Sequence, residues 1–178
     1  MQRVRRVLVI WAAVLLLFQM PPKRAAGAAR SSTVRGDSGQ TLAIIVNRAN
    51  PVDDLSFAEL RKIFLGRRSH WPNDRRIAIV MLEPGQPERE TVLREIYRMT
   101  ESEYRDHFLK GLFTGEVFVS PKTLSSPAVV RKFVFNAPGA IGYLRESDVD
   151  ESVKVIRVDG RLPDDRDYLL QIDARQVN

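Results

Sequence analysis

Residues 41–66 read TLAIIVNRANPVDDLSFAELRKIFLG, and this stretch predicts a strand, a break and a short helix in that order. The run from Thr41 to Asn47 is apolar and rich in β-branched residues, which is typical of a buried strand. Asn50-Pro51 ends the run, because the residue before a proline is restricted in its backbone conformation. The fold is therefore expected to begin with a strand in its core.

The helix that follows has a clear start and a clear end. Ser56 and Glu59 have the spacing of a capping box, in which the first side chain accepts a hydrogen bond from the backbone of the fourth residue. Gly66 is a typical helix stop. Between them, apolar residues recur at helical spacing and predict one buried face. These residues are Leu55, Leu60, Ile63 and Phe64.

The same cues predict further elements along the chain. Strands are expected at 77–82, 140–144 and 153–158. Helices are expected at 87–99, at 100–111 and from Ser126-Pro127 to Pro138, with a loop over 112–123. The order β-α-β-α-α-α-β-β predicts a mixed α/β sheet with helices on its faces.

The N-terminus has the pattern of a secretory signal peptide. Residues 1–28 carry five basic and no acidic side chains, and they enclose the apolar run 7–20. We expect cleavage after Ala28, a periplasmic protein and no stable membrane span after cleavage. The alternative is an uncleaved anchor, because Lys23 and Arg24 follow the apolar run.

Three segments follow the predicted signal peptide. Residues 29–40 are small and polar and predict a flexible leader. Residues 41–160 hold the predicted α/β domain. Residues 161–178 form a polar tail, in which Tyr168-Leu169-Leu170 is the expected docking point.

The charge of the chain changes when the signal peptide is set aside. The whole chain has 28 Lys and Arg against 22 Asp and Glu, a net charge of +6. Without residues 1–28, 23 basic and 22 acidic side chains remain, a net charge of +1. A nearly neutral domain argues against a nucleic-acid partner. The chain also has no cysteine, which excludes disulfides, thiolate metal sites and a cysteine nucleophile.

The loop at 83–91 is the candidate ligand site. It joins the end of a predicted strand to the start of a helix, where backbone N–H groups favour anions. Arg89 is suited to a bidentate grip on an oxyanion, and Thr91 offers a hydroxyl. Glu88 and Glu90 support the alternative of an ordinary acidic helix start, since they repel an anion unless they point away. The candidate ligand-binding residues are Gly85, Gln86, Arg89 and Thr91.

Other chemistry-bearing groups have simpler explanations. The basic stretch 66–76 favours a surface turn whose Trp71 packs into the core, rather than a polyanion site. His107 follows Glu103 by four residues, which predicts a helix-surface ion pair rather than two metal ligands. A metal site needs further ligands, and His70 is the only other histidine. We expect no metal, no cofactor and no enzymatic activity.

Several segments together resemble the phosphate-type periplasmic substrate-binding proteins of ABC transporters. They are Asn47–Pro51, Leu55–Gly66, Trp71–Asp74, Phe113–Gly115 and Pro138–Tyr143. The resemblance covers about Leu42 to Val158. It implies a type 2 periplasmic-binding-protein fold, which has two lobes, and the chain has room for a single lobe.

The resemblance also implies a function, with departures at the site. The phosphate binders have an Arg at the end of the second strand and a Ser-Gly-Thr at the next helix start, whereas this chain has Met81–Pro87 there. Arg89 is placed like an Arg that the short relatives keep early in the helix. The resemblance implies binding of a small oxyanion, phosphate foremost, and an envelope transporter or sensor as partner. The alternative is a protein-interaction or sensory module that has lost phosphate binding.

Overall fold

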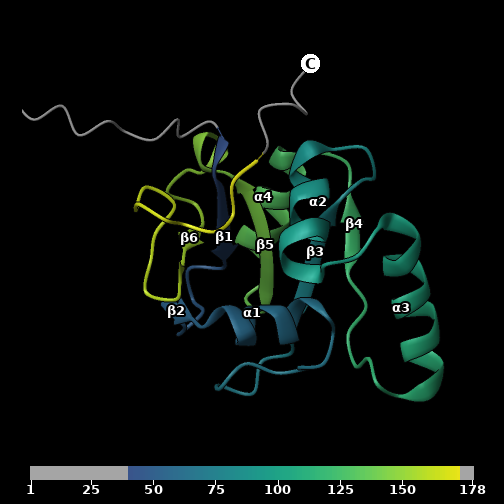
Figure 1. Cartoon of the computed structure of the whole chain (residues 1–178). Coiled ribbons are helices and arrows are strands. Elements are labelled where there is room, and N and C mark those ends of the chain that lie inside the picture. The colour runs from purple at the N-terminus through teal and green to yellow at the C-terminus, as the bar shows by residue number, and fades with distance from the viewer. Residues whose placement is uncertain (1–39, 173–178) are drawn as a thin grey trace, which may run out of the picture. The chain divides into compact units, whose positions relative to one another are not determined.

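The computed structural model describes residues 40–172, so the predicted signal peptide and all but the last residue of the leader lie outside the described residues. The described part contains a five-stranded mixed sheet with the order β4-β3-β5-β1-β6 (Figure 1). Its strands are β1 (Leu42–Val46), β3 (Ala78–Leu82), β4 (Lys122–Leu124), β5 (Ala140–Arg145) and β6 (Lys154–Val155). β3 runs parallel to β4 and β5, whereas β1 runs antiparallel to β5 and β6. A separate parallel pair joins β2 (Asp54–Leu55) to β7 (Arg157–Val158).

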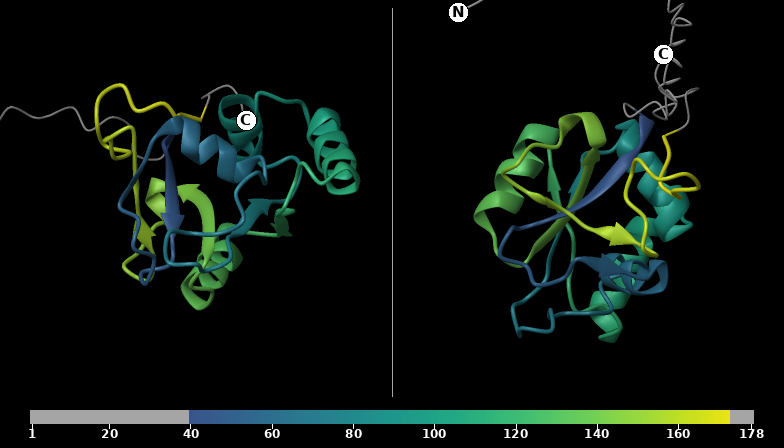
Figure 2. Two further views of the ribbon diagram at one scale, coloured as in Figure 1. Left: turned by 90° about the horizontal axis from the view of Figure 1, so that it is seen from below. Right: turned by 90° about the vertical axis from the view of Figure 1, so that its left-hand side faces the viewer.

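Helices cover both faces of the sheet (Figure 2). Helix α4 (Pro127–Asn136) packs on one face, where a Cβ on Gly142 of β5 would lie 2.4 Å from Val80 Cγ2 and 3.4 Å from Val130 Cγ1. The next residue, Tyr143, points to the opposite face, and its ring centroid lies 6.5 Å from that of Phe64. Strand alternation therefore gives α4 a small residue to pack on and gives the other face an aromatic core.

The other face holds three consecutive helical segments of the chain. They are α1 (Phe57–Phe64), α2 (Pro87–Val92) and the π-helix η2 (Leu93–Tyr97), which continues α2. Helix α3 (Glu101–Thr114) stands beyond β4 at the edge of the sheet (Figure 1). No helix within residues 40–172 has the length and apolar character needed to cross a membrane.

The helix starts predicted from capping residues are confirmed. Ser56, Thr100 and Ser126 are the N-caps of α1, α3 and α4, and each side chain accepts a hydrogen bond from the backbone three residues on. The predicted stop of α1 at Gly66 is also confirmed. Gly66 has a φ of 73°, and a Cβ there would lie 2.3 Å from the carbonyl oxygen of Val119. Both the turn and the close approach require glycine.

Four predicted boundaries are wrong, two of them in helices. The helix expected at 87–99 changes to π geometry at Leu93 and ends at Arg98, which has a φ of 56°. Helix α3 continues past Gly111, because Gly111 packs against Val117 and the left-handed turn falls at Gly115.

The other two corrections concern strands. The loop expected at 112–123 contains the end of α3 and the start of β4. The strand expected at 153–158 is two short strands, since the chain changes partner at Ile156. The Ile156 N–H donates to Ile44 O of β1, and the next N–H, of Arg157, donates to Asp53 O.

The C-terminal segment docks where the sequence indicated. Tyr168 and Leu170 are buried, and the Leu42 N–H donates to Leu170 O at 2.8 Å. Ile172 is also buried and its N–H donates to Gln40 O. The last described residues therefore hold the beginning of β1.

Candidate functional site

The loop between β3 and α2 brings the four candidate residues to the end of the sheet. Gly85 has a φ of 86°, which allows the tight turn after Pro84. Gln86 is the N-cap of α2, and its side chain makes no capping hydrogen bond. Pro87 takes the first helical position, where a missing N–H costs nothing. Local sequence thus places Arg89 and Thr91 in the first turns of α2.

Arg89 is buried, and each of its three guanidinium nitrogens donates a hydrogen bond. Its side chain is 3% exposed. Nη1 donates to Leu82 O at 2.6 Å, while Nε and Nη2 donate to the two carboxylate oxygens of Glu101 at 2.9 and 2.8 Å. This is a bidentate guanidinium–carboxylate pair, the geometry that also suits two oxygens of a phosphate. In this structure the two carboxylate oxygens of Glu101 accept both of these hydrogen bonds.

The other candidates divide into exposed and engaged residues. Thr91 is fully buried, and its hydroxyl donates to Pro87 O at 2.9 Å. Gly85 is exposed and lines a pocket, whereas Gln86 is half-buried and does not line it. The structure therefore brings Gly85 and Gln86 to the loop surface, with Arg89 beneath and the Thr91 hydroxyl turned into its own helix.

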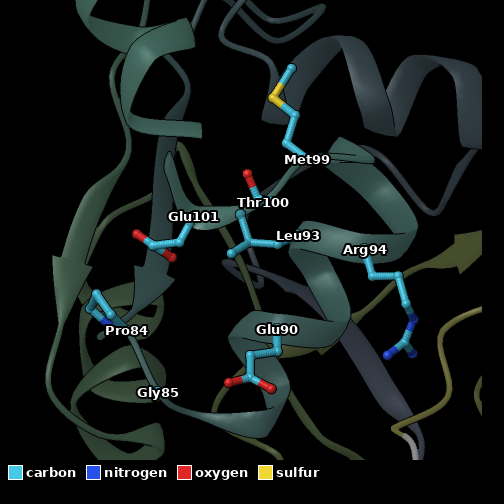
Figure 3. Close-up of a pocket in the computed structure, with 8 residues that line it drawn as sticks. All are labelled: Pro84, Gly85, Glu90, Leu93, Arg94, Met99, Thr100 and Glu101. Atoms are coloured by element: carbon cyan, nitrogen blue, oxygen red, sulfur yellow. The ribbon is translucent and has the colours of Figure 1, made fainter. Parts of the chain in front are cut away.

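The pocket beside this loop has a volume of about 220 Å³ (Figure 3). Its lining comes from the β3–α2 loop, from α2 and η2, and from the start of α3. The lining residues are Pro84, Gly85, Glu90, Leu93, Arg94, Met99, Thr100 and Glu101. Glu101 belongs both to this lining and to the pair with Arg89, and its side chain is 34% exposed. Glu101 therefore connects the pocket to Arg89, which is not among the lining residues.

Glu88 does not oppose an anion in the pocket. Its side chain is 6% exposed and forms an ion pair with Nε of Arg145 on β5. Glu90, in contrast, is exposed and lines the pocket. Of the two carboxylates expected to repel an anion, Glu88 points away from the pocket and Glu90 lines it.

Tyrosines frame Arg89 from the core side. The Arg89 guanidinium carbon lies 4.9 Å from the ring centroid of Tyr104. The Tyr143 hydroxyl accepts a hydrogen bond from the Leu82 N–H at 3.0 Å. Burial raises the pKa of Tyr104 to about 12 and raises the pKa of Tyr143 further. Both phenols stay neutral across the physiological range, so the charges around Arg89 come from carboxylates.

The other residues singled out in the sequence, Trp71 and His107, have structural roles. Trp71 is buried and its Nε1–H donates to Gly139 O at 2.9 Å, which confirms that the basic stretch is a turn anchored in the core. His107 Nε2 lies 3.0 Å from Leu65 O, and Glu103 accepts from Thr100 instead. The predicted His107–Glu103 ion pair is therefore wrong. Within the described residues, no three His, Cys, Asp or Glu side chains gather as a metal site would require.

Sequence reasoning missed Glu101 as part of the site. The sequence shows it only as an acidic residue in the first turn of a helix, twelve positions after Arg89. Arg94 and Met99, which also line the pocket, were part of the predicted helix 87–99. The signal that would find them is the turn from η2 into α3, which folds residues 99–101 back onto the loop.

The chain is similar to proteins of known function. No family model matches the chain. The phosphate-binding protein PstS of Bacillus subtilis is 32% identical over 124 residues, which cover 69% of this chain and 37% of PstS. The chain resembles the phosphate-binding proteins of ABC transporters. The resemblance inferred from the sequence is thereby confirmed.

Comparison with solved structures also finds phosphate-binding proteins of ABC transporters. An ABC-type phosphate transport receptor from Vibrio cholerae matches with a TM-score of 0.58 and 25% identity, over 70% of this chain and 48% of the receptor. A substrate-binding protein of Clostridium perfringens with bound phosphate matches with a TM-score of 0.58 and 24% identity, over 70% and 47%. The type 2 periplasmic-binding-protein fold class is confirmed. The chain spans half or less of the length of these relatives.

Proposed function

We propose that this chain is an exported solute-binding protein that binds a small oxyanion, phosphate foremost, at the loop between β3 and α2. The observation that carries the proposal is the bidentate pair of Arg89 with Glu101, because a buried guanidinium already holds two carboxylate oxygens there. The similarity to phosphate-binding relatives supports phosphate as the anion. The proposed setting is the periplasm, with an ABC transporter as partner.

In this proposal the ligand replaces the carboxylate of Glu101. Arg89 stays in place because Nη1 remains bound to Leu82 O. Glu101 is partly exposed, so its carboxylate turns toward water without leaving a charge buried. Gly85 contacts the ligand as part of the pocket lining, and the half-buried Gln86 reaches it by turning its uncapped side chain toward the pocket. Thr91 acts through the first turn of α2, since its hydroxyl is donated to Pro87 O.

The test is anion binding by the full chain. We expect phosphate to raise the melting temperature in a concentration-dependent way, with about 2.7 kcal/mol of stabilisation at a hundred times the Kd. Sulfate and chloride at equal ionic strength are the controls. Arg89→Lys keeps the charge and loses the fork, so it should weaken binding. Calorimetric titration of the same variant separates lost binding from lost stability.

A second pocket arginine sharpens this test. Arg94 also lines the pocket, and it donates hydrogen bonds to Glu95 and to Gln171 O. If Arg94→Gln abolishes binding while Arg89→Lys does not, the anion lies at Arg94. If millimolar phosphate does not raise the melting temperature of the wild type, of Arg89→Lys or of Arg94→Gln, the proposal of oxyanion binding is wrong.

One observation favours a second function, that of a protein-interaction or sensory module. The guanidinium of Arg89 bonds to groups of this chain through Nε, Nη1 and Nη2, so the resting site is satisfied without a ligand. A chain that shows no anion response, yet binds the periplasmic face of a purified envelope transporter or sensor, would have this function.

A further inference from the structure

Helix α3 is apolar on two opposite sides. Tyr104, Phe108 and Gly111 are buried against the rest of the fold. On the outer side, Leu109, Leu112 and Phe113 are 61%, 52% and 85% exposed. These three residues, here called the α3 patch, lie within one turn of each other because their spacing is three and four. An exposed apolar cluster of this kind marks an interaction surface.

The exposure of the α3 patch is a fixed feature of the fold. The ring of Tyr104 meets Tyr97 edge-on at 5.0 Å and lies 4.9 Å from the ring of Phe108. His107 Nε2 contacts Leu65 O at 3.0 Å. These contacts hold the inner side of the helix, so the outer side is presented in one orientation.

The chain after α3 adds to this surface. The Val117 N–H donates to Gly111 O, which folds the loop back against the helix. Val117 and Val119 are buried, and Phe118 between them is 56% exposed. All four exposed apolar side chains stay more than half exposed among the described residues 40–172, and α3 lies at the outer edge of the fold beyond β4 (Figure 1).

We propose that the α3 patch binds a second copy of this chain, with the two α3 helices antiparallel about a twofold axis. Arg105 lies one turn before Leu109, and Glu116 follows the C-cap of the helix. Both are exposed, and neither forms an ion pair among the described residues.

The direction of pairing follows from these charges. Helix α3 ends at Thr114 and Gly115 turns left-handed, so Glu116 lies just beyond the end of the helix. Antiparallel pairing centred on Leu109 and Leu112 brings Arg105 of each copy toward the end of the other helix, where Glu116 of the partner subunit lies. The twofold axis repeats both contacts, so both copies use the same surface for the dimer. A patch with a basic residue before its apolar centre and an acidic residue after it is complementary to itself.

The size of the patch fixes the strength of the dimer. A helix of 14 residues is about 21 Å long. An interface of one such helix and the Phe118 loop lies at the small end of specific interfaces, below about 1,200 Å². The dimer therefore dissociates on dilution.

The surface is separate from the proposed ligand pocket. Glu101 is the first residue of α3, and Phe113 lies about 18 Å further along the helix. Self-association is measured by sedimentation and anion binding by calorimetric titration, so the two proposals are tested independently.

The first test is sedimentation velocity of the full chain over a wide concentration range. We expect the wild type to pass from monomer to dimer, and Phe113→Asp to need at least about tenfold higher concentration, because a charge replaces the most exposed apolar group. Val129→Asp is the matched control, since Val129 is 41% exposed on α4. Arg105→Glu and Glu116→Arg should each weaken the dimer, and the double variant should restore it.

The second test uses the absence of cysteine from the chain. Leu112→Cys gives each copy a single thiol near the twofold axis, and mild oxidation should form an intermolecular disulfide. Val129→Cys should not. A wild type that stays monomeric, a dimer that Phe113→Asp does not weaken, or equal cross-linking of the two cysteine variants would overturn the proposal.

Discussion

Two arginine–carboxylate pairs flank the start of α2, and they are buried in opposite senses. In the pair of Arg89 with Glu101, the arginine is 3% exposed and the carboxylate 34%. In the pair of Arg145 with Glu88, the arginine is 23% exposed and the carboxylate 6%. The member that reaches water is the one able to leave, because it recovers hydration when the pair opens.

Under the proposed function, this difference in exposure distinguishes a ligand-binding arginine from a structural ion pair. If Glu101 leaves, a buried guanidinium becomes available to an incoming anion. If Arg145 leaves, a buried carboxylate is stranded and nothing is gained for an anion. Under the proposed function, the Arg89 pair exchanges its carboxylate for an anion, whereas the Arg145 pair attaches α2 to β5.

The largest expected effect comes from opening the fixed pair. Arg145→Met should lower the free energy of unfolding by about 3 kcal/mol, because the buried carboxylate of Glu88 loses its countercharge. Urea unfolding measures this change. Adding Glu88→Gln to Arg145→Met should recover part of the loss, since a neutral amide is cheaper to bury. A double variant no more stable than the single one contradicts the assignment of the cost to Glu88.

A smaller effect on stability, with a gain in binding, is expected at the exchangeable pair. Glu101→Gln should cost about 1–2 kcal/mol, since the amide oxygen still accepts one guanidinium N–H. It should also raise phosphate affinity about tenfold, because the competing carboxylate is gone. Calorimetric titration gives the affinity.

The control for Glu101→Gln is Glu103→Gln in the same helical turn. Glu103 accepts hydrogen bonds from the backbone and hydroxyl of Thr100 and does not contact Arg89. Its substitution should leave phosphate affinity unchanged. If phosphate binds the wild type and Glu101→Gln with equal affinity, Glu101 does not compete for Arg89.

The smallest effect concerns Glu103 itself. Hydrogen bonds from the Thr100 backbone and hydroxyl hold the pKa of Glu103 below its usual value of 4.5. Its contribution to stability is therefore complete above about pH 4.5 and is lost as the pH falls through the lowered pKa. Urea unfolding between pH 7 and pH 3 should show a shallower acid dependence in Glu103→Gln. Parallel curves for the two proteins would contradict this.

Local signals made much of the fold predictable. The caps at Ser56, Thr100 and Ser126 act within one helical turn, so spacing in the sequence is spacing in space. The continuous apolar run of β1 reflects burial of the whole strand. β4 gave no such signal, because its three residues are largely exposed at the sheet edge.

The site was less predictable because its decisive contact is tertiary. Arg89 was identified from its place after the strand, but its burial and its pairing with Glu101 depend on how η2 turns into α3. The left-handed conformation of Arg98, which makes that turn, is unusual for a residue other than glycine. The apolar outer side of α3 was hidden by the expectation that the helix ends at Gly111.

The placement of β1 has a kinetic consequence. The first strand of the sheet pairs only with β5 and β6, about a hundred residues later in the chain. Its N-terminal end is held by Leu170, later still. A chain emerging from the ribosome cannot close this sheet until almost all of it has been made, and contacts of such long range form slowly. β1 thus keeps this sheet from closing until synthesis of the chain is nearly complete.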